Sequence, residues 1–178
     1  MTGVQLRPAV SADATNIAQV HVASWQAGYA GILPADYLAE LSVADRAIMW
    51  QSFFAADPAE HRCVCTVAIV EDQIVGFATT GPDRTYPADQ ETGELWSMYV
   101  DPTHWGSQVA KELIAAARRE LRSGGRLHNT LWVLTENLRA RRFYEREGWS
   151  NDDVHRVDEL DDLALDHVRY SIELGALI

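Results

Sequence analysis

Residues 131–149 read L-W-V-L-T-E-N-L-R-A-R-R-F-Y-E-R-E-G-W, which predicts a buried strand followed by a short helix. At about 100° per residue, Asn137, Ala140 and Tyr144 share a narrow arc of that helix. The side chains expected on its opposite side are Arg139, Arg142 and Arg146. An amide and a phenol on the inward face of a helix are typical of a ligand site. This stretch therefore indicates an enzyme.

The composition is that of a globular protein. The 178 residues, 47% of them hydrophobic, fit a single domain spanning residues 1–178. The formal net charge of −11 disfavours binding to nucleic acid or to an anionic membrane. It is compatible with a cationic partner, although solubility alone is the favoured explanation of an acidic composition.

Nothing in the sequence predicts a membrane segment, a secretory signal or a metal site. No apolar run approaches the roughly 20 residues of a membrane helix, and the N-terminus lacks a basic segment followed by an apolar core. Cys63 and Cys65 are the only cysteines, and their spacing suits neither a disulfide nor zinc. The six histidines show no ligand spacing. We therefore expect a cytoplasmic protein without a metal.

The rest of the chain alternates strand and helix patterns, with Ser11 as the expected cap of the first helix. The acidic segment 151–166 is expected to be a solvated loop, and a further strand after Gly148 stays open. The expected elements are strands over 4–8, 63–70, 74–80, 94–100 and 167–174, helices over 11–28, 37–41, 44–55 and 108–122, and the strand and helix of 131–149. This order predicts one α/β domain with a mixed sheet.

Three motifs carry a resemblance to a known family. Residues 137–149 read N-x-x-A-x-x-F-Y-E-x-x-G-W, residues 94–102 read E-L-W-S-M-Y-V-D-P, and residues 25–34 read W-x-x-x-Y-x-G-I-L-P. With these motifs the chain resembles a GNAT superfamily N-acetyltransferase along nearly its whole length. The resemblance implies a GNAT-type fold, with a central mixed sheet splayed between two parallel strands and helices on both faces.

The resemblance also implies acetyl-CoA as co-substrate, lying in the gap between the two parallel strands. Strand backbone groups would pair with pantetheine, and the amides that open the helix at Gln108 would receive the pyrophosphate. Asn137 would contact pantetheine, and Tyr144 would lie near the sulfur and donate a proton to the leaving thiolate. The implied cofactor contacts are Met98, Tyr99, Val100, Gly106, Ser107, Gln108, Val109, Ala110, Lys111, Asn137 and Tyr144.

The implied reaction is direct attack of a neutral amine on a thioester. An alkylamine with a pKa of about 10 must first lose a proton, to a carboxylate or a water relay, and the resemblance assigns the carboxylate to Glu94. It places Trp25 and Tyr29 against the acceptor. Structural alternatives stay open: Asn137 as a helix cap, Tyr144 as a core phenol, Glu94 as a solvated strand end, and the two aromatic residues as core.

The phosphate loop departs from the family pattern R/Q-x-x-G-x-G/A. Residues 105–110 read W-G-S-Q-V-A, in which Gly106 and Ala110 fit. Trp105 replaces the basic or amide residue, and Gln108 replaces the central glycine that lets backbone approach a phosphate. We therefore predict that CoA binds more weakly than in relatives with an intact loop.

Two functions compete at this point. The first is an acetyl-CoA-dependent N-acetyltransferase acting on a primary amine of a small molecule or of a peptide terminus. The second is a degenerate GNAT domain that binds CoA or another ligand in a regulatory role without turnover. Trp105 and Gln108 favour the second, whereas the retained Glu94, Asn137 and Tyr144 favour the first. The resemblance leaves a homodimer open.

Overall fold

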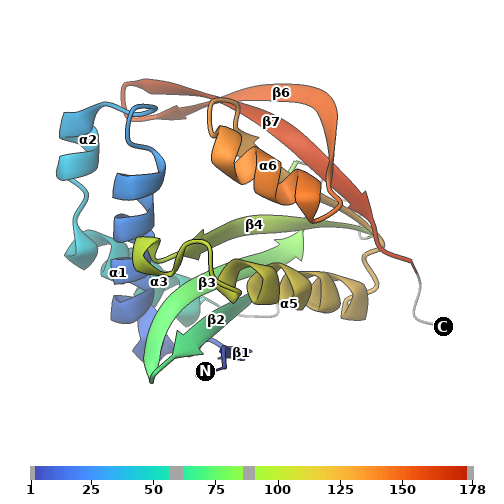
Figure 1. Cartoon of the computed structure of the whole chain (residues 1–178), viewed down its shortest axis with the longest axis horizontal. Helices are drawn as coiled ribbons and strands as arrows, with labels where there is room; N and C mark the ends of the chain where they lie inside the picture. The colour runs from blue at the N-terminus through green and yellow to red at the C-terminus, as the bar shows by residue number, and fades with distance from the viewer. Residues whose placement is uncertain (1–2, 57–61, 86–90, 176–178) are drawn as a thin grey trace.

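The computed structural model of the chain describes residues 3–56, 62–85 and 91–175, which form a seven-stranded mixed sheet with helices on both faces (Figure 1). The strands are β1 (Gln5–Pro8), β2 (Val64–Val70), β3 (Gln73–Pro82), β4 (Thr92–Val100), β5 (His128–Leu134), β6 (Ser150–Leu160) and β7 (Leu163–Glu173). The helices are α1 (Ala14–Gly28), α2 (Ala35–Ala39), α3 (Val43–Ala55), α5 (Val109–Ser123) and α6 (Leu138–Arg146), with 3-10 turns η1 (Ser11–Asp13) and η2 (Pro102–His104). The predicted α/β class with a mixed sheet is confirmed.

Helix α5 packs on one face of the sheet, and α1 and α3 pack on the other. Leu113 and Ile114 of α5 are fully buried, and each such side chain stabilises the fold by roughly 1.5–3 kcal/mol. Gly76 of β3 lies directly beneath α5, where an added Cβ would stand 2.9 Å from Leu113 Cδ1. On the other face, Ile17 of α1 and Phe77 of β3 are equally inaccessible.

The sheet opens between its two parallel strands. In the order β1-β2-β3-β4-β5-β7-β6, β4 and β5 are the parallel pair. Their pairing covers Thr92–Leu95 against His128–Leu131 and then stops, whereas β3 stays paired with β4 as far as Val100. Residues 96–100 of β4 therefore lack a neighbouring strand on the β5 side. This is the predicted splay.

The prediction of a solvated loop over 151–166 is wrong. This segment forms most of β6 and the start of β7, a hairpin that turns at Asp161 and Asp162. Its acidic side chains have cross-strand partners: Asp152 Oδ2 accepts a hydrogen bond from Arg169 Nε at 2.8 Å. A run of acidic residues fits the exposed face of a strand as well as a loop, because carboxylates on that face can be paired with residues of the neighbouring strand. The strand left open after Gly148 is β6.

Ser11 does not cap the first helix through its side chain, contrary to expectation. Asp13 ends η1, and its Oδ2 accepts hydrogen bonds from the Val10 backbone N–H at 2.8 Å and from Arg7 Nη1 at 2.6 Å. The Asp13 carboxylate is a better hydrogen-bond acceptor at the start of the helix than the Ser11 hydroxyl, because it also pairs with the Arg7 guanidinium.

Candidate active site

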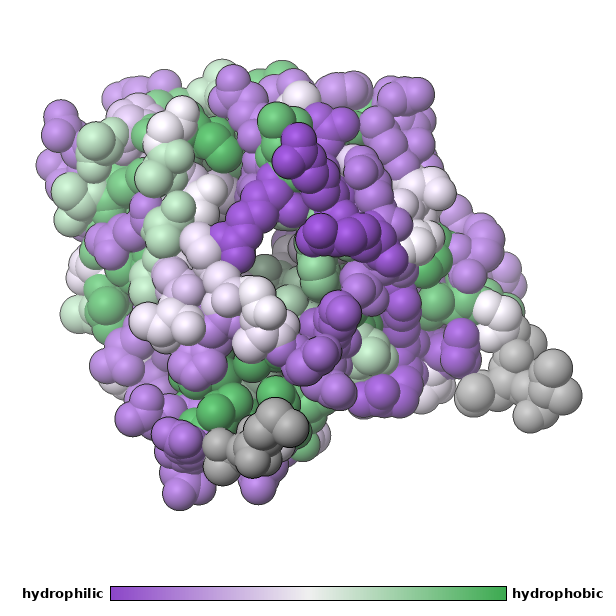
Figure 2. Space-filling view, in the orientation of Figure 1, coloured by the Kyte–Doolittle hydropathy of each residue, from purple (hydrophilic) through white to green (hydrophobic). Residues whose placement is uncertain are grey.

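A cavity of about 760 Å³ passes through the splay and connects the two faces of the sheet. Figure 2 shows its opening as a hollow below α6 with hydrophilic residues along the α6 side. The α6 half is lined by Leu95, Met98, Val100, His104, Trp105, Gly106, Ser107, Ala110, Lys111, Val133, Asn137, Arg139, Ala140, Phe143, Tyr144, Arg146 and Glu147. The α1 half is lined by Ser24, Trp25, Gly28, Tyr29, Leu33, Arg84, Trp96, Ser97, Tyr99, Trp132, Leu134, Arg156, Leu165 and His167.

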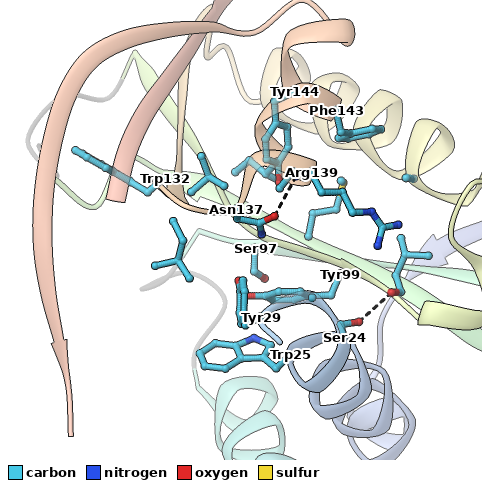
Figure 3. A pocket seen from close by; sticks show the side chains of 18 of the residues that line it. Ser24, Trp25, Tyr29, Ser97, Tyr99, Trp132, Asn137, Arg139, Phe143 and Tyr144 are labelled. Carbon is cyan, nitrogen blue, oxygen red and sulfur yellow. Dashed lines mark hydrogen bonds between the residues drawn. The ribbon is translucent and has the colours of Figure 1, made fainter. Parts of the chain in front are cut away.

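Helix α6 presents Asn137 and Tyr144 to the cavity, as predicted (Figure 3). Asn137 Oδ1 accepts a hydrogen bond from the Ala140 backbone N–H at 3.1 Å, so the residue is the N-cap of α6. That bond leaves its Nδ2 group without a partner among the described residues. Burial raises the pKa of Tyr144, which is 8% exposed, and the nearby Tyr99 raises it further. The phenol is therefore a protonated donor at neutral pH.

The prediction that Arg139 and Arg146 point away from the site is wrong, since both line the cavity. The Arg139 guanidinium lies over the Trp105 ring, 3.4 Å from its centroid. A helical wheel fixes only the direction of the Cβ atom, and a long arginine side chain at the start of a helix reaches an indole on the neighbouring loop. Arg142 is exposed and outside the cavity lining.

The conformation of the loop before α5 allows the loop backbone to come close to a ligand. Gly106 has φ +79°, a conformation that favours glycine, and nothing lies within 4 Å of an added Cβ there. Gln108 has φ −76°, so its side chain costs no backbone strain. Ser107, Ala110 and Lys111 line the cavity beside Gly106. The Gln108 and Val109 side chains are not in the lining, and that of Val109 is buried in the core.

The open edge of β4 offers backbone groups to the cavity. Asp101 N donates to Val75 O of the β3 side, so the groups of the alternate residues Met98 and Val100 face the gap. The Val100 carbonyl is already in use, because it accepts from Trp105 Nε1 at 2.8 Å and from Ser24 Oγ at 3.0 Å. Its two lone pairs leave no acceptor there for pantetheine. The groups left open on this edge are those of Met98 and the Val100 N–H.

Aromatic side chains dominate the α1 half. Trp25 and Tyr29, which the resemblance places against the acceptor, line it with their ring centroids 5.0 Å apart (Figure 3). The Tyr99 side chain also lies on this side, 3.5 Å from the Tyr29 hydroxyl, although it was predicted as a cofactor contact. His21 stacks on Tyr99 with centroids 4.9 Å apart, and burial lowers the pKa of this histidine to about 3. These aromatic side chains therefore carry no charge of their own at neutral pH.

The alternative of Glu94 as a solvated strand end is wrong, since the residue has no exposed surface. Its Oε1 accepts from Arg84 Nη2 at 2.5 Å and from Arg84 Nε at 3.1 Å, and its Oε2 accepts from the Arg84 backbone N at 2.8 Å. Arg84 lines the α1 half, whereas Glu94 is outside the lining. The carboxylate therefore holds the guanidinium at the cavity wall.

Comparison with known proteins decides the family. The model of the acetyltransferase (GNAT) family matches residues 25–149. The chain belongs to the GNAT acetyltransferase family. A curated relative is the uncharacterized N-acetyltransferase YuaI of Bacillus subtilis (strain 168), 29% identical over 137 residues that cover 75% of this chain and 73% of that protein.

Solved structures share the fold. The PaiA N-acetyltransferase of Thermoplasma acidophilum, in complex with coenzyme A, has a TM-score of 0.71 at 18% identity, covering 93% of this chain and 98% of its own. YncA of Salmonella typhimurium, with its cofactor acetyl-CoA, has a TM-score of 0.68 at 18% identity, covering 97% and 94%. A GCN5-related N-acetyltransferase of Rhodopseudomonas palustris reaches 0.77 at 22% identity, covering 98% of each chain.

The sequence reasoning missed several residues of this N-acetyltransferase site. Trp96 lies on β4, Trp132 on β5, Arg156 on β6 and His167 on β7, and all four line the α1 half. No short motif joins them, because they meet only when these strands pair. The available signal was Trp132. Its neighbours Leu131 and Val133 are apolar and buried, so a large side chain between them points to the opposite face of the sheet.

Among the described residues, no helix is long and apolar enough to cross a membrane.

Proposed function

We propose that this GNAT protein transfers the acetyl group of acetyl-CoA to a primary amine of a small molecule or a peptide terminus. The observation that carries the proposal is one continuous cavity through the sheet, with the Tyr144 phenol between its α6 and α1 halves. Two substrates entering from opposite faces would meet there without displacing the core.

The residues of the α6 half fit CoA. The open β4 edge at Met98 and the free Nδ2 of Asn137 suit the amides of pantetheine, which require donors and acceptors. Lys111, Arg139 and Arg146 supply cations for its phosphates, and the backbone N–H groups of Ala110 and Lys111 in the first turn of α5 supply donors. Arg139 on Trp105 thus provides a positive charge where the loop itself has lost one.

Acetyl-CoA supplies an activated acetyl group as a thioester. The acceptor nitrogen forms a bond to the acetyl carbon, the carbon–sulfur bond breaks, and Tyr144 donates its proton to the departing sulfur. The backbone N–H of Met98 faces the gap and would stabilise the carbonyl oxygen as charge develops on it. The products are an amide and a free thiol.

The proton of the attacking amine needs an acceptor, for which Glu94 was predicted. Both oxygens of Glu94 are bonded to Arg84, so the carboxylate would have to give up an ion pair to serve as a base. We propose that water in the cavity takes this proton and that Glu94 positions Arg84.

Thiol release from acetyl-CoA in the presence of a panel of primary amines tests the proposal. We expect at least one amine to raise the release rate well above the rate with water alone, with the acetylated amine detected by mass spectrometry. CoA binding by calorimetry without thiol release for any amine would instead support the regulatory domain that does not turn over.

A further inference from the structure

The α1 half of the cavity is positively charged, although the chain carries a net charge of −11. Arg84 and Arg156 line it, and no aspartate or glutamate among the described residues does. The one carboxylate in the whole described lining, Glu147, lies just beyond the last residue of α6 on the opposite side. The charge of the cavity lining is therefore opposite in sign to the net charge of the protein.

Arg156 is held in place with part of its hydrogen-bonding capacity free. Its guanidinium lies over the Trp132 ring, 4.2 Å from the centroid, and its Nε donates to Asp158 Oδ2 at 3.0 Å. The two terminal nitrogens have no partner among the described residues, and the side chain is 32% exposed. A guanidinium fixed by stacking and by one hydrogen bond loses little entropy when it binds a ligand.

Asp158 braces Arg156 and does not offer its charge to a ligand in the cavity. The same Oδ2 atom lies 3.2 Å from His167 Nδ1, and Asp158 is outside the cavity lining. The buried Trp132 Nε1 also lacks a partner among the described residues. The polar groups left without partners around Arg156 are thus donors, which a ligand oxygen satisfies.

Arg84 contributes less to this charge. Its Nε and one terminal nitrogen are bonded to the fully buried Glu94, and its guanidinium lies over the Trp96 ring at 5.0 Å. The Glu94 carboxylate offsets the Arg84 charge directly. Arg156, both of whose terminal nitrogens lack a partner among the described residues, is the stronger anion partner of the two.

We propose that the acceptor is an amine that also carries a carboxylate, as an amino acid does, and that Arg156 binds this carboxylate through its terminal nitrogens. The inference rests on the proposed acetyl transfer to an amine. A carboxylate forms two charge-assisted hydrogen bonds with a guanidinium fork. A diamine, a polyamine or a basic peptide would bring a second ammonium group beside Arg156, where none of the described residues of the α1 half supplies a carboxylate to receive it.

Matched acceptors test this proposal. Initial rates are measured with acetyl-CoA and free amino acids, their carboxamides, and the amines that decarboxylation gives. We expect kcat/KM to be about 10- to 100-fold higher for the acids, as one charge-assisted interaction provides. Acceptors that react equally well or better without the carboxylate would overturn the inference and leave acetyl transfer standing.

Variants locate the contact. Arg156→Gln is expected to raise KM for the acids about 10- to 100-fold with little change for the carboxamides, and Arg156→Lys should recover part of the loss. Arg169→Gln is the matched control, because Arg169 forms a similar pair with Asp152 on the same hairpin but is outside the cavity lining. Equal losses for acids and carboxamides in Arg156→Gln would refute the contact. Absence of turnover with every amine would instead refute the proposed function.

Discussion

The two halves of the cavity are built in different ways. The α6 half comes from two consecutive strand-to-helix units, β4–α5 and β5–α6, so its residues are close in the chain. The α1 half gathers side chains from α1, β4, β5, β6 and β7. Site residues that are close in the chain form a recognisable sequence motif, whereas residues that come together only on folding do not. Under the proposed function, the first half indicates the reaction and the second selects the acceptor.

The positive charges of the two halves also differ. In the α6 half, Lys111, Arg139 and Arg146 have no carboxylate partner among the described residues. In the α1 half, Glu94 and Asp158 brace Arg84 and Arg156. Cations without a carboxylate partner suit a polyanion such as CoA, and braced ones suit a single small anion. The predictions below separate these two roles.

The largest effect is expected at the junction of the halves. Tyr144→Phe removes the hydroxyl and keeps the ring, and we expect kcat to fall by roughly 10²-fold or more, as for other lost proton donors. KM for acetyl-CoA should change little. Steady-state kinetics measure both, and unfolding curves check that the buried ring still packs. An unchanged kcat would remove Tyr144 from the mechanism and leave it as a core phenol.

A smaller effect is expected for the cation of the α6 half. Arg139→Gln should raise Kd for CoA about tenfold, because one charge-assisted contact to a phosphate is lost. Calorimetry with CoA measures this loss.

Two controls sharpen that test. Arg142→Gln changes an exposed arginine of the same helix outside the cavity, and it should leave Kd unchanged. Acetyl-pantetheine lacks the nucleotide phosphates, so its binding should not respond to Arg139→Gln. A loss of equal size for acetyl-pantetheine would mean that Arg139 acts on the shape of the site.

The aromatic wall of the α1 half should make stability depend on pH. Burial lowers the pKa of His21 to about 3, so a falling pH protonates this residue in the unfolded chain before it does so in the folded protein. Its contribution to stability is complete above about pH 6.5 and is lost as the pH falls towards 3. At pH 5.5 the loss amounts to about 1.4 kcal/mol.

Urea unfolding of wild type and His21→Gln at pH 7.5 and 5.5 measures this loss. The difference in unfolding free energy between the two proteins should shrink at the lower pH, since all other titrating groups are shared. A difference that is equal at both pH values would contradict the assignment to His21.

The smallest effect is expected in the phosphate loop. Gln108 already has a helical φ of −76°, so Gln108→Gly relieves no strain and should change Kd for CoA by less than about threefold. Calorimetry with CoA tests this as well. A gain of tenfold or more in CoA affinity would show that the Gln108 side chain obstructs the phosphates, as the departure of the loop from the family pattern predicts.

Several elements of the site were predictable from residue patterns. The spacing of Asn137 and Tyr144 predicts that both side chains lie on one face of α6, because an α-helix has a fixed periodicity. Both side chains line the cavity. The side chain of Arg139 was misplaced, because its partner Trp105 belongs to a different strand-to-helix unit. The strand after Gly148 stayed open and the loop predicted over 151–166 is wrong, because pairing with β7 neutralises carboxylates that look solvated in the sequence.

The sequence by itself determined the GNAT family, the mixed α/β fold, and the helix that presents an amide and a phenol, because these depend on local periodicity and short motifs. Only the tertiary structure decided that Glu94 is paired with Arg84, that Trp105 supports Arg139, and that Arg156 reaches the α1 half of the cavity. Each of these contacts joins residues from different elements, so its geometry exists only after the strands pair and the sheet opens.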